Sequence, residues 1–339
     1  MIGAPVAVSD EVAALHRDAF VIDLHNDTLT KLSHVSYDFA ARHRPAAFWN
    51  PFRLDIDLPK LRAGGIDGLG CALFSGFRLA PARRFWRMVD LARRLVAEHA
   101  QDLALCDTAL ALRQARDTGR VGLFLGVEGS YVVDRDVDEN LARLAAAGVR
   151  YLGPLWERDS RAGGSCRSRH DGGLTGVGRA LVRACDRHGI VIDTAHAGKR
   201  TFADLAAAST GPIFSSHTGA WGVRRHPRNL EDDQIREIAR RGGVVGVIFV
   251  SPYARSTFGA TLRDVADHVE HLVRIGGEDC VAFGSDYDGF MPLVRGMRDA
   301  ADLPRLTQVL WDRGWREPQL RKLLGENALK FFERAWTPR

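Results

Sequence analysis

Eight short apolar segments, separated by stretches with helical periodicity, are the feature that most constrains the fold of this 339-residue chain. Each segment is almost continuously hydrophobic and rich in β-branched residues, as a parallel strand buried on both faces must be. The intervening stretches, such as VDLARRLVAEHA and LVRACDRHG, repeat apolar residues at the spacing of an amphipathic helix. The eight segments are 21–25, 66–74, 121–129, 149–155, 190–196, 212–217, 243–250 and 280–286.

This alternation predicts an α/β protein, a (β/α)8 TIM barrel formed by one domain over residues 1–339, with its core at about 20–333. A doubly wound open sheet alternates in the same way, but it usually carries a glycine-rich phosphate loop after its first strand. Here the first apolar segment ends instead in His-Asn-Asp at 25–27, which favours the barrel. Two long polar stretches are predicted to be loops over the barrel mouth, 30–60 and 157–175.

The formal net charge of +5 comes largely from arginines that cluster on predicted amphipathic helices. No interleaved aromatics or nucleic-acid motif accompany them, so we interpret them as solvated helix faces and predict no nucleic-acid partner. Five cysteines without a CxxC pair favour a reducing, cytoplasmic location. The first twenty residues do not resemble a signal peptide, and no stretch reaches the roughly 18 apolar residues of a membrane span, so we predict no membrane association.

Metal-capable or acidic side chains close five of the eight apolar segments. In a barrel the carboxyl ends of the strands converge on one face, so residues far apart in the sequence are expected to gather around one point. These residues are His25 and Asp27, Glu128, His196, His217 and Asp286.

The first five of them suit a pair of zinc ions. His25 and Asp27 are two residues apart, and strand alternation aims both side chains the same way. Glu128 follows a buried segment in which an unpaired carboxylate is costly. With His196 and His217 these groups can serve two ions if Glu128 bridges them, and they leave positions open for water. Taken singly, each has a structural alternative, namely a hydrogen-bonded core histidine, a helix-capping aspartate or an ion pair; the joint pattern favours metal binding.

Asp286 ends the last segment, in GSDYDG. A carboxylate there can take a proton from a metal-activated water and pass it to a leaving amine. The alternative role is that of a turn residue, for which Asp288, before Gly289, is the better candidate. We therefore predict that Asp286 is the catalytic residue.

Together these motifs resemble those of the membrane dipeptidase (renal dipeptidase) family, a branch of the metal-dependent amidohydrolase barrels. The resemblance implies a binuclear zinc metallopeptidase that hydrolyses a dipeptide with a free C-terminal carboxylate, using a hydroxide held between the metal ions. It also suggests a homodimer. The matching stretches, in family order, are VIDLHNDTL, LPKLRAGGI, VEGS, VIDTAHAG, SSHTGAW, HPRNLEDDQIREIARRGGVVGV, FGSDYDGF and LGENALKFFE.

The resemblance also divides the ligands between two Zn2+ ions per subunit. It implies that His25 and Asp27 bind the first ion, that His196 and His217 bind the second, and that Glu128 bridges both.

For the substrate, the resemblance implies that Asp286 is the general acid/base and that Arg228, in HPRN, binds the C-terminal carboxylate by a charge-assisted bidentate contact. Without the resemblance, Arg228 would be interpreted as a surface arginine. Trp156 and Tyr253 complete the predicted substrate-binding residues.

One departure from the family pattern follows the segment 149–155, where many relatives read RYLTLTHN and place a histidine against the scissile carbonyl. Trp156 stands at that position here. Its indole N–H can donate to the same oxygen, or His170 on the next loop can supply an imidazole, or the substrate is another small amide, lactam or conjugate. A barrel that binds metal without catalysis is the remaining alternative, and the complete set of ligands argues against it.

Overall fold

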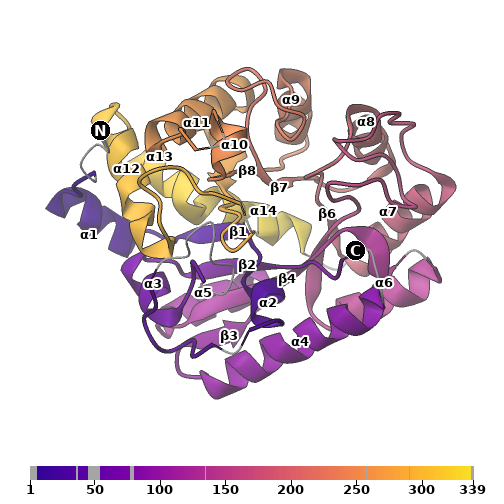
Figure 1. The fold of residues 1–339 in the computed structure, drawn as a ribbon, viewed down its shortest axis with the longest axis horizontal. Helices are drawn as coiled ribbons and strands as arrows, with labels where there is room; N and C mark the ends of the chain where they lie inside the picture. Colours follow the sequence, from indigo (N-terminus) through magenta and orange to yellow (C-terminus); the bar gives the residue numbers. More distant parts are fainter. Residues whose placement is uncertain are drawn as a thin grey trace.

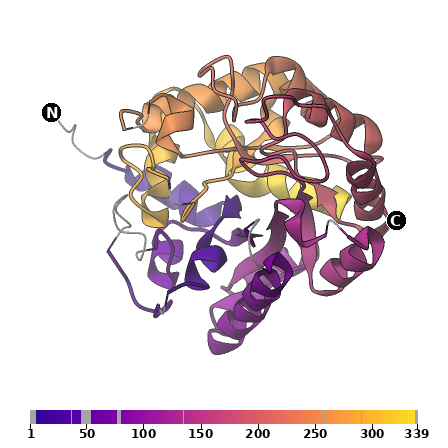
Figure 2. The ribbon, with the colours of Figure 1, turned by 45° about the vertical axis from the view of Figure 1, so that its right-hand side comes forward.

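The computed structural model describes residues 6–35, 37–44, 54–76, 80–133, 135–256, 258–289 and 291–336. It shows an α/β fold in which a curled parallel sheet lies at the centre and the helices form the periphery, with α4 along the lower edge of Figure 1. The same arrangement is visible after a rotation of 45° in Figure 2.

The sheet contains nine strands, of which eight follow one another in the order β6-β5-β4-β2-β1-β9-β8-β7. All of their pairings are parallel, and each of the eight predicted segments overlaps one of these strands. The ninth, β3, was not predicted, because it has three residues and pairs only with the start of β4. The strands are β1 (Ile22–Asn26), β2 (Gly68–Leu73), β3 (Leu103–Leu105), β4 (Val121–Glu128), β5 (Val149–Gly153), β6 (Val191–Ile192), β7 (Ser215–Thr218), β8 (Val245–Val247) and β9 (Val281–Phe283).

The two strands at the ends of this order, β6 and β7, lie beside each other. A parallel bridge joins Asp193, just after β6, to Phe214, just before β7. The Thr194 N–H donates to the carbonyl of Phe214 at 2.8 Å, and the Phe214 N–H donates to the carbonyl of Ile192 at 3.3 Å. The sheet therefore curls back on itself, which is consistent with a TIM-like barrel.

Side-chain caps fix where several helices begin. Thr108 accepts the N–H of Ala111 at the start of α5, and Thr175 accepts the N–H of Gly178 at the start of α7. At its other end α7 stops at Gly189, whose φ of 65° favours glycine, and β6 begins two residues later. The helices are α1 (Asp10–Asp18), α2 (Thr28–Leu32), α3 (Leu58–Ala63), α4 (Pro81–Glu98), α5 (Ala109–Asp117), α6 (Val137–Ala146), α7 (Gly176–His188), α8 (Lys199–Ala208), α9 (Asp232–Arg240), α10 (Ser251–Ala254), α11 (Leu262–Gly276), α12 (Leu303–Asp312), α13 (Glu317–Arg321) and α14 (Asn327–Ala335).

An aromatic cluster fills the space between the strands and α14. The buried ring of Tyr151 contacts Phe124 and Phe214 edge-on, with centroids 6.3 and 5.5 Å apart, and residues of α14 join the same cluster. A Cβ at Gly126 would lie 1.9 Å from the Tyr151 ring, so only glycine fits beneath it. This cluster fills the interior on the side of α14 with apolar side chains. Polar side chains can therefore gather only at the opposite side, at the carboxyl ends of the strands.

The two predicted loops differ in their content of regular structure. The stretch 157–175 contains no helix or strand, as predicted, and a bridge from Ser165 to Ala197 holds it beside the end of β6. The stretch 30–60 includes the end of α2 and the start of α3, and its residues 36 and 45–53 lie outside the described residues.

Within the described ranges, no helix has both the length and the apolar composition that a membrane span requires. All five cysteines have free thiols. The cytoplasmic location stays a prediction.

Candidate metal centre

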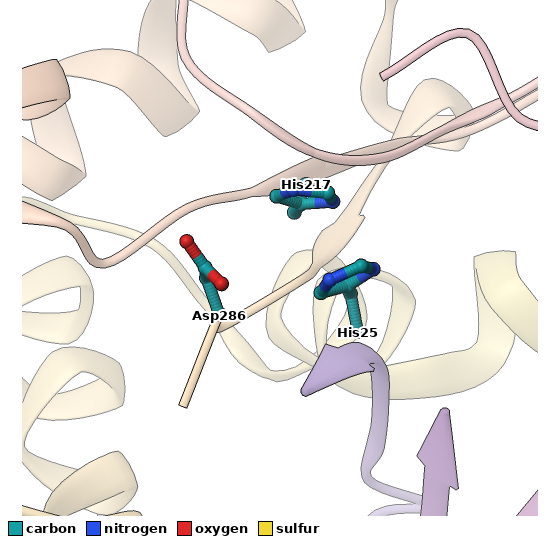
Figure 3. A group of neighbouring side chains, drawn as sticks. All are labelled: His25, His217 and Asp286. Atoms are coloured by element: carbon teal, nitrogen blue, oxygen red, sulfur yellow. The ribbon is translucent and has the colours of Figure 1, made fainter. Parts of the chain in front are cut away.

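The six side chains predicted from the strand ends lie together at the carboxyl edge of the sheet. Their ligand atoms form overlapping groups, in each of which all atoms lie within 4.8 Å of one another. In Figure 3 the rings of His25 and His217 face each other, with centroids 3.6 Å apart and planes inclined by 27°, and Asp286 lies beside them. The groups are His25-His217-Asp286, His25-Asp27-Glu128 and Glu128-His196-His217.

Glu128, the last residue of β4, belongs to two of these groups, as do His25 and His217. Its Oε1 lies 2.9 Å from His196 Nε2, 3.6 Å from His217 Nε2 and 3.9 Å from His25 Nε2. One carboxylate oxygen therefore faces three imidazole nitrogens from three different strand ends.

The spacing of these atoms fits a metal ion. His196 Nε2 and His217 Nε2 are 3.1 Å apart, close to the roughly 3.3 Å that separates two nitrogens bound at about 2.0–2.1 Å to one tetrahedral zinc. His25 Nε2 is buried and has no hydrogen-bond partner among the described residues. A buried nitrogen without a hydrogen-bond partner, beside a carboxylate, fits the donor set of a metal ion.

Asp27 reaches the site in a way that the sequence argument did not foresee. The pairing of β1 with β2 is irregular between Asp23 and Asn26, β1 ends at Asn26, and Asp27 occupies the N-cap position of α2. Its side chain makes no capping hydrogen bond to α2. His25 and Asp27 converge through an irregular strand end and a helix start rather than through regular alternation.

Two residues of the site have strained backbones. His196 has a φ of 64° and Asp286 a φ of 61°, in the left-handed region that favours glycine. Such conformations persist only where surrounding contacts enforce them, and they concentrate at functional sites.

Burial makes the carboxyl groups hard to ionise in the metal-free protein. It raises the pKa of Asp27 to about 7, with the charge of Asp288 adding to the effect. Burial, and next the charge of Asp27, raise the pKa of both Glu128 and Asp286 well above the usual range. Bound cations would reverse these shifts and keep all three groups ionised.

The pKa values of the three imidazoles are shifted in the opposite direction, downwards. Burial lowers the pKa of His25 and His217 well below the usual value and that of His196 to about 3, with neighbouring positive charges contributing. All three are neutral at physiological pH, which is the form that binds metal ions.

The family model of the membrane dipeptidases, peptidase family M19, matches residues 9–337. The chain belongs to this family.

Three solved structures are similar to this chain over most of its length. The metallopeptidase dipeptidase AC, of family M19, is 29% identical with a TM-score of 0.84, covering 94% of this chain and 99% of its own. A metallopeptidase from Rhodobacter sphaeroides, solved with a phosphinate mimic of the dipeptide L-Ala-D-Ala, is 27% identical with a TM-score of 0.84 and coverages of 94% and 100%. An amidohydrolase from Pseudomonas aeruginosa is 25% identical, with a TM-score of 0.80 and coverages of 96% and 99%.

Arg228 lies beside the candidate metal centre, and its side chain is almost fully buried. Its Nη2 donates to the carbonyl of His217 at 2.9 Å, and its guanidinium lies 5.9 Å from the centre of the Tyr253 ring. Its Nε is 3.8 Å from Oε1 of Glu157. A carboxylate of the protein therefore already faces the predicted carboxylate-binding arginine.

Glu157 was not predicted as a site residue. Its Oε1 lies 3.3 Å from His196 Nδ1, and its other oxygen accepts a hydrogen bond from Arg167. Burial by itself would raise the pKa of Glu157. The contact with His196, followed by those with Arg228 and Arg167, outweighs burial and lowers the pKa to about 2. The available signal was its position directly after Trp156, at the end of the fourth predicted segment, 149–155.

The remaining predicted residues are placed as follows. Trp156 is half-buried and its ring packs against Phe74, with centroids 4.6 Å apart. Tyr253 is buried in α10 and packs against His226. His170 is exposed on the stretch 157–175 and is not a member of any group of close ligand atoms in the described chain.

A cavity of about 400 Å³ opens beside His196, the one predicted metal ligand among the described residues that line it. Arg228, Cys166, Lys199 and Trp221 also line it. Its volume lies in the range of small-molecule sites, so a dipeptide-sized ligand has room beside the candidate metal centre.

Proposed function

We propose that this protein is a metal-dependent dipeptidase that holds two zinc ions and hydrolyses the amide bond of a dipeptide with a free C-terminal carboxylate. One observation carries the proposal: a single oxygen of buried Glu128 lies within 3.9 Å of three neutral imidazole nitrogens, in a chain that belongs to the membrane dipeptidase family. This arrangement supports metal binding far better than it supports a structural ion pair, because all three histidines are uncharged.

The proposed ligand sets follow the observed groups. His25 and Asp27 would hold one ion, His196 and His217 the other, and Glu128 would bridge them. When bound, the two ions supply a water of lowered pKa and polarise the scissile carbonyl.

The side chains of the protein perform the remaining steps. Asp286 accepts the proton of the attacking water on its carboxylate and donates it to the nitrogen of the leaving amine. Arg228 pairs with the C-terminal carboxylate and so aligns the peptide, and Trp156 and Tyr253 border the bound substrate.

A second candidate function is hydrolysis of another small amide, lactam or conjugate. Two observations favour it, namely Trp156 at the position of a family histidine, and Glu157 facing Arg228 at 3.8 Å. Both alter the surroundings of the substrate and leave the metal ligands intact.

A substrate panel on zinc-loaded protein separates these functions. We expect two zinc ions per chain by elemental analysis and turnover of L,L or L,D dipeptides, with little turnover of cyclic amides. The Asp286→Ala variant should keep both ions and lose nearly all activity. Turnover of cyclic amides alone would favour the second function, and failure to bind zinc would refute both.

Three further predictions accompany this function. We propose that residues 1–339 form one domain, that the protein forms a homodimer, and that it acts in the cytoplasm on a small substrate without a nucleic-acid or membrane partner. The free thiols of all five cysteines support a reducing compartment.

A further inference from the structure

We infer that Ser216 is a positioning residue whose hydroxyl fixes the tautomers of two metal-binding imidazoles at once, one for each of the two ions of the proposed function. Ser216 Oγ lies 2.8 Å from His217 Nδ1 and 3.2 Å from His25 Nδ1. It also donates to Oδ2 of Asp193 at 2.5 Å. Ser216 is fully buried, and Asp193 is 3% exposed.

Counting hydrogens at this hydroxyl leaves one arrangement. A serine hydroxyl has one proton to donate and two lone pairs to accept with. Asp193 takes the proton, because Ser216 Oγ donates to its Oδ2 at 2.5 Å while its Oδ1 accepts the backbone N–H groups of Ala195 and Ser216 at 3.0 and 2.9 Å. Both lone pairs of Ser216 are then directed to accept N–H groups from the two rings.

A proton on Nδ1 determines the state of Nε2, on the opposite edge of each ring. A neutral imidazole with a proton on Nδ1 carries a lone pair on Nε2, the atom that can bind a metal ion. In both rings Nε2 faces Oε1 of Glu128, at 3.9 Å for His25 and 3.6 Å for His217. Ser216 therefore prepares both nitrogens before any ion arrives.

The backbone holds Ser216 in place for this role. The pairing of β7 with β8 is irregular between Ser215 and Thr218, the stretch that contains Ser216 and His217. A Cβ at Gly246 or Gly284 would lie only 1.9 or 1.8 Å from the Ser216 carbonyl oxygen. Glycines in β8 and directly after β9 thus let the backbone pack closely against the Ser216 carbonyl, which limits its movement.

The third imidazole is held differently, since His196 Nδ1 faces Glu157 at 3.3 Å. The inference therefore applies to His25 and His217 only, and His196 serves as an internal reference.

The chain contains a matched control in Ser285. Its Oγ donates to Oδ2 of Asp23 at 2.6 Å and its N–H to Oδ1 at 2.8 Å, as Ser216 does with Asp193. Ser285 is 1% exposed, so both serines are buried partners of a strand-end aspartate. The Ser285 hydroxyl lies 3.2 Å from the backbone carbonyl oxygen of His25, but among the described residues no imidazole nitrogen is within hydrogen-bond distance of it.

The first test uses the unmodified protein without metal. With ¹⁵N-labelled histidine and a chelator present, we expect the NMR signals of His25 and His217 to show protonated Nδ1 and unprotonated Nε2. In the absence of zinc, only hydrogen bonding can impose this state. A proton on Nε2 of either ring would overturn the inference, and this measurement requires no variant to fold.

The second test compares Ser216→Ala with Ser285→Ala by chelator competition for zinc. Loss of a hydrogen-bond partner behind a metal ligand typically lowers affinity by about 10- to 100-fold. We expect that loss for Ser216→Ala, together with a mixed tautomer population in the metal-free protein, and less than about threefold loss for Ser285→Ala. Equal zinc affinity in the two variants would refute the role of Ser216 while leaving the dipeptidase proposal intact. Failure of the unmodified protein to bind zinc would refute the dipeptidase proposal, and the tautomers would still be measurable.

Discussion

The two sides of the candidate metal centre differ in charge. On the side of β1 and β9, Asp27 and Asp286 share a hydrogen bond, and Asp288 lies close behind them with Lys31 Nζ 3.4 Å from its Oδ1. On the side of β6 and β7, the imidazoles of His196 and His217 are neutral, and the cation of Arg228 faces the single carboxylate of Glu157 at 3.8 Å. Burial is similar on both sides, so the difference lies in the residue types.

This contrast explains what each side can bind. Buried carboxylates that repel one another require cations, so the first side gains most from zinc. The second side carries a buried arginine next to the cavity and is suited to an anionic group of the substrate. Glu128 lies between the two sides and contacts histidines from both.

The largest effect is expected where the two sides meet, at Glu128→Gln. The amide keeps the shape of the side chain but removes the charge that both proposed ions share, so zinc content should fall and activity should drop on the order of 10⁴-fold. Elemental analysis and dipeptide turnover measure this. Full zinc content in the variant would show that the two sides do not depend on a shared carboxylate.

The next largest effect is expected on the acidic side, at Asp286→Asn. The variant keeps a side chain of the same size but cannot move a proton, so kcat should fall on the order of 10³-fold with zinc content unchanged. A pH–rate profile should also lose the limb that Asp286 contributes. If zinc is lost together with activity, Asp286 is a ligand rather than a proton carrier.

A smaller effect, restricted to one substrate class, is expected on the basic side at Arg228→Met. Removing one charge-assisted contact should raise KM roughly 10- to 100-fold for dipeptides with a free α-carboxylate. C-terminal amides of the same dipeptides serve as the control and should change little. An equal rise in KM for both would contradict the assignment of Arg228 to the carboxylate.

The acidic side also predicts a pH effect on the metal-free protein. Asp27 has a folded-state pKa of about 7, against about 3.9 in an unfolded chain. Its ionisation therefore destabilises the folded state progressively between pH 4 and 7, and the cost is fully present above that range. Asp27→Asn should raise the Tm of the metal-free protein by a few degrees at pH 8 and by less at pH 5. With zinc present the sign should reverse, because a ligand is lost.

The smallest effect is expected at Glu157→Gln, which removes the negative charge facing Arg228. We expect KM for carboxylate-bearing dipeptides to fall a few-fold, because Arg228 then pairs with the substrate alone. Steady-state kinetics with free and amidated dipeptides measure this change. No change in KM would indicate that Glu157 acts only on His196.

Much of this architecture was predictable because it depends on local patterns. Buried parallel strands must be apolar along their whole length, so eight strands stood out. Strand β3 did not, since three residues carry too little pattern. The candidate ligands were recognisable because a histidine or carboxylate at the end of a buried apolar segment is unusual, as at Glu128 and His217.

The supporting residues could not be found in this way. Ser216 and Asp193 are 23 positions apart and look like ordinary strand-end residues until β6 and β7 bring them within 2.5 Å. Glu157 is separated from His196 by 39 positions and contacts it only through the path of the irregular stretch after β5. Neither contact leaves a sequence pattern, because no fixed spacing produces it.

By itself, the sequence determined the alternation of strands and helices and the residue types available at the strand ends, because both follow from which side chains tolerate burial and which bind metal. The tertiary structure decided the relations between them: the irregular strand end that directs His25, the helix start that carries Asp27, and the shared hydroxyl behind two imidazoles. These depend on distances between separate strands, which are fixed only when the sheet curls and packs.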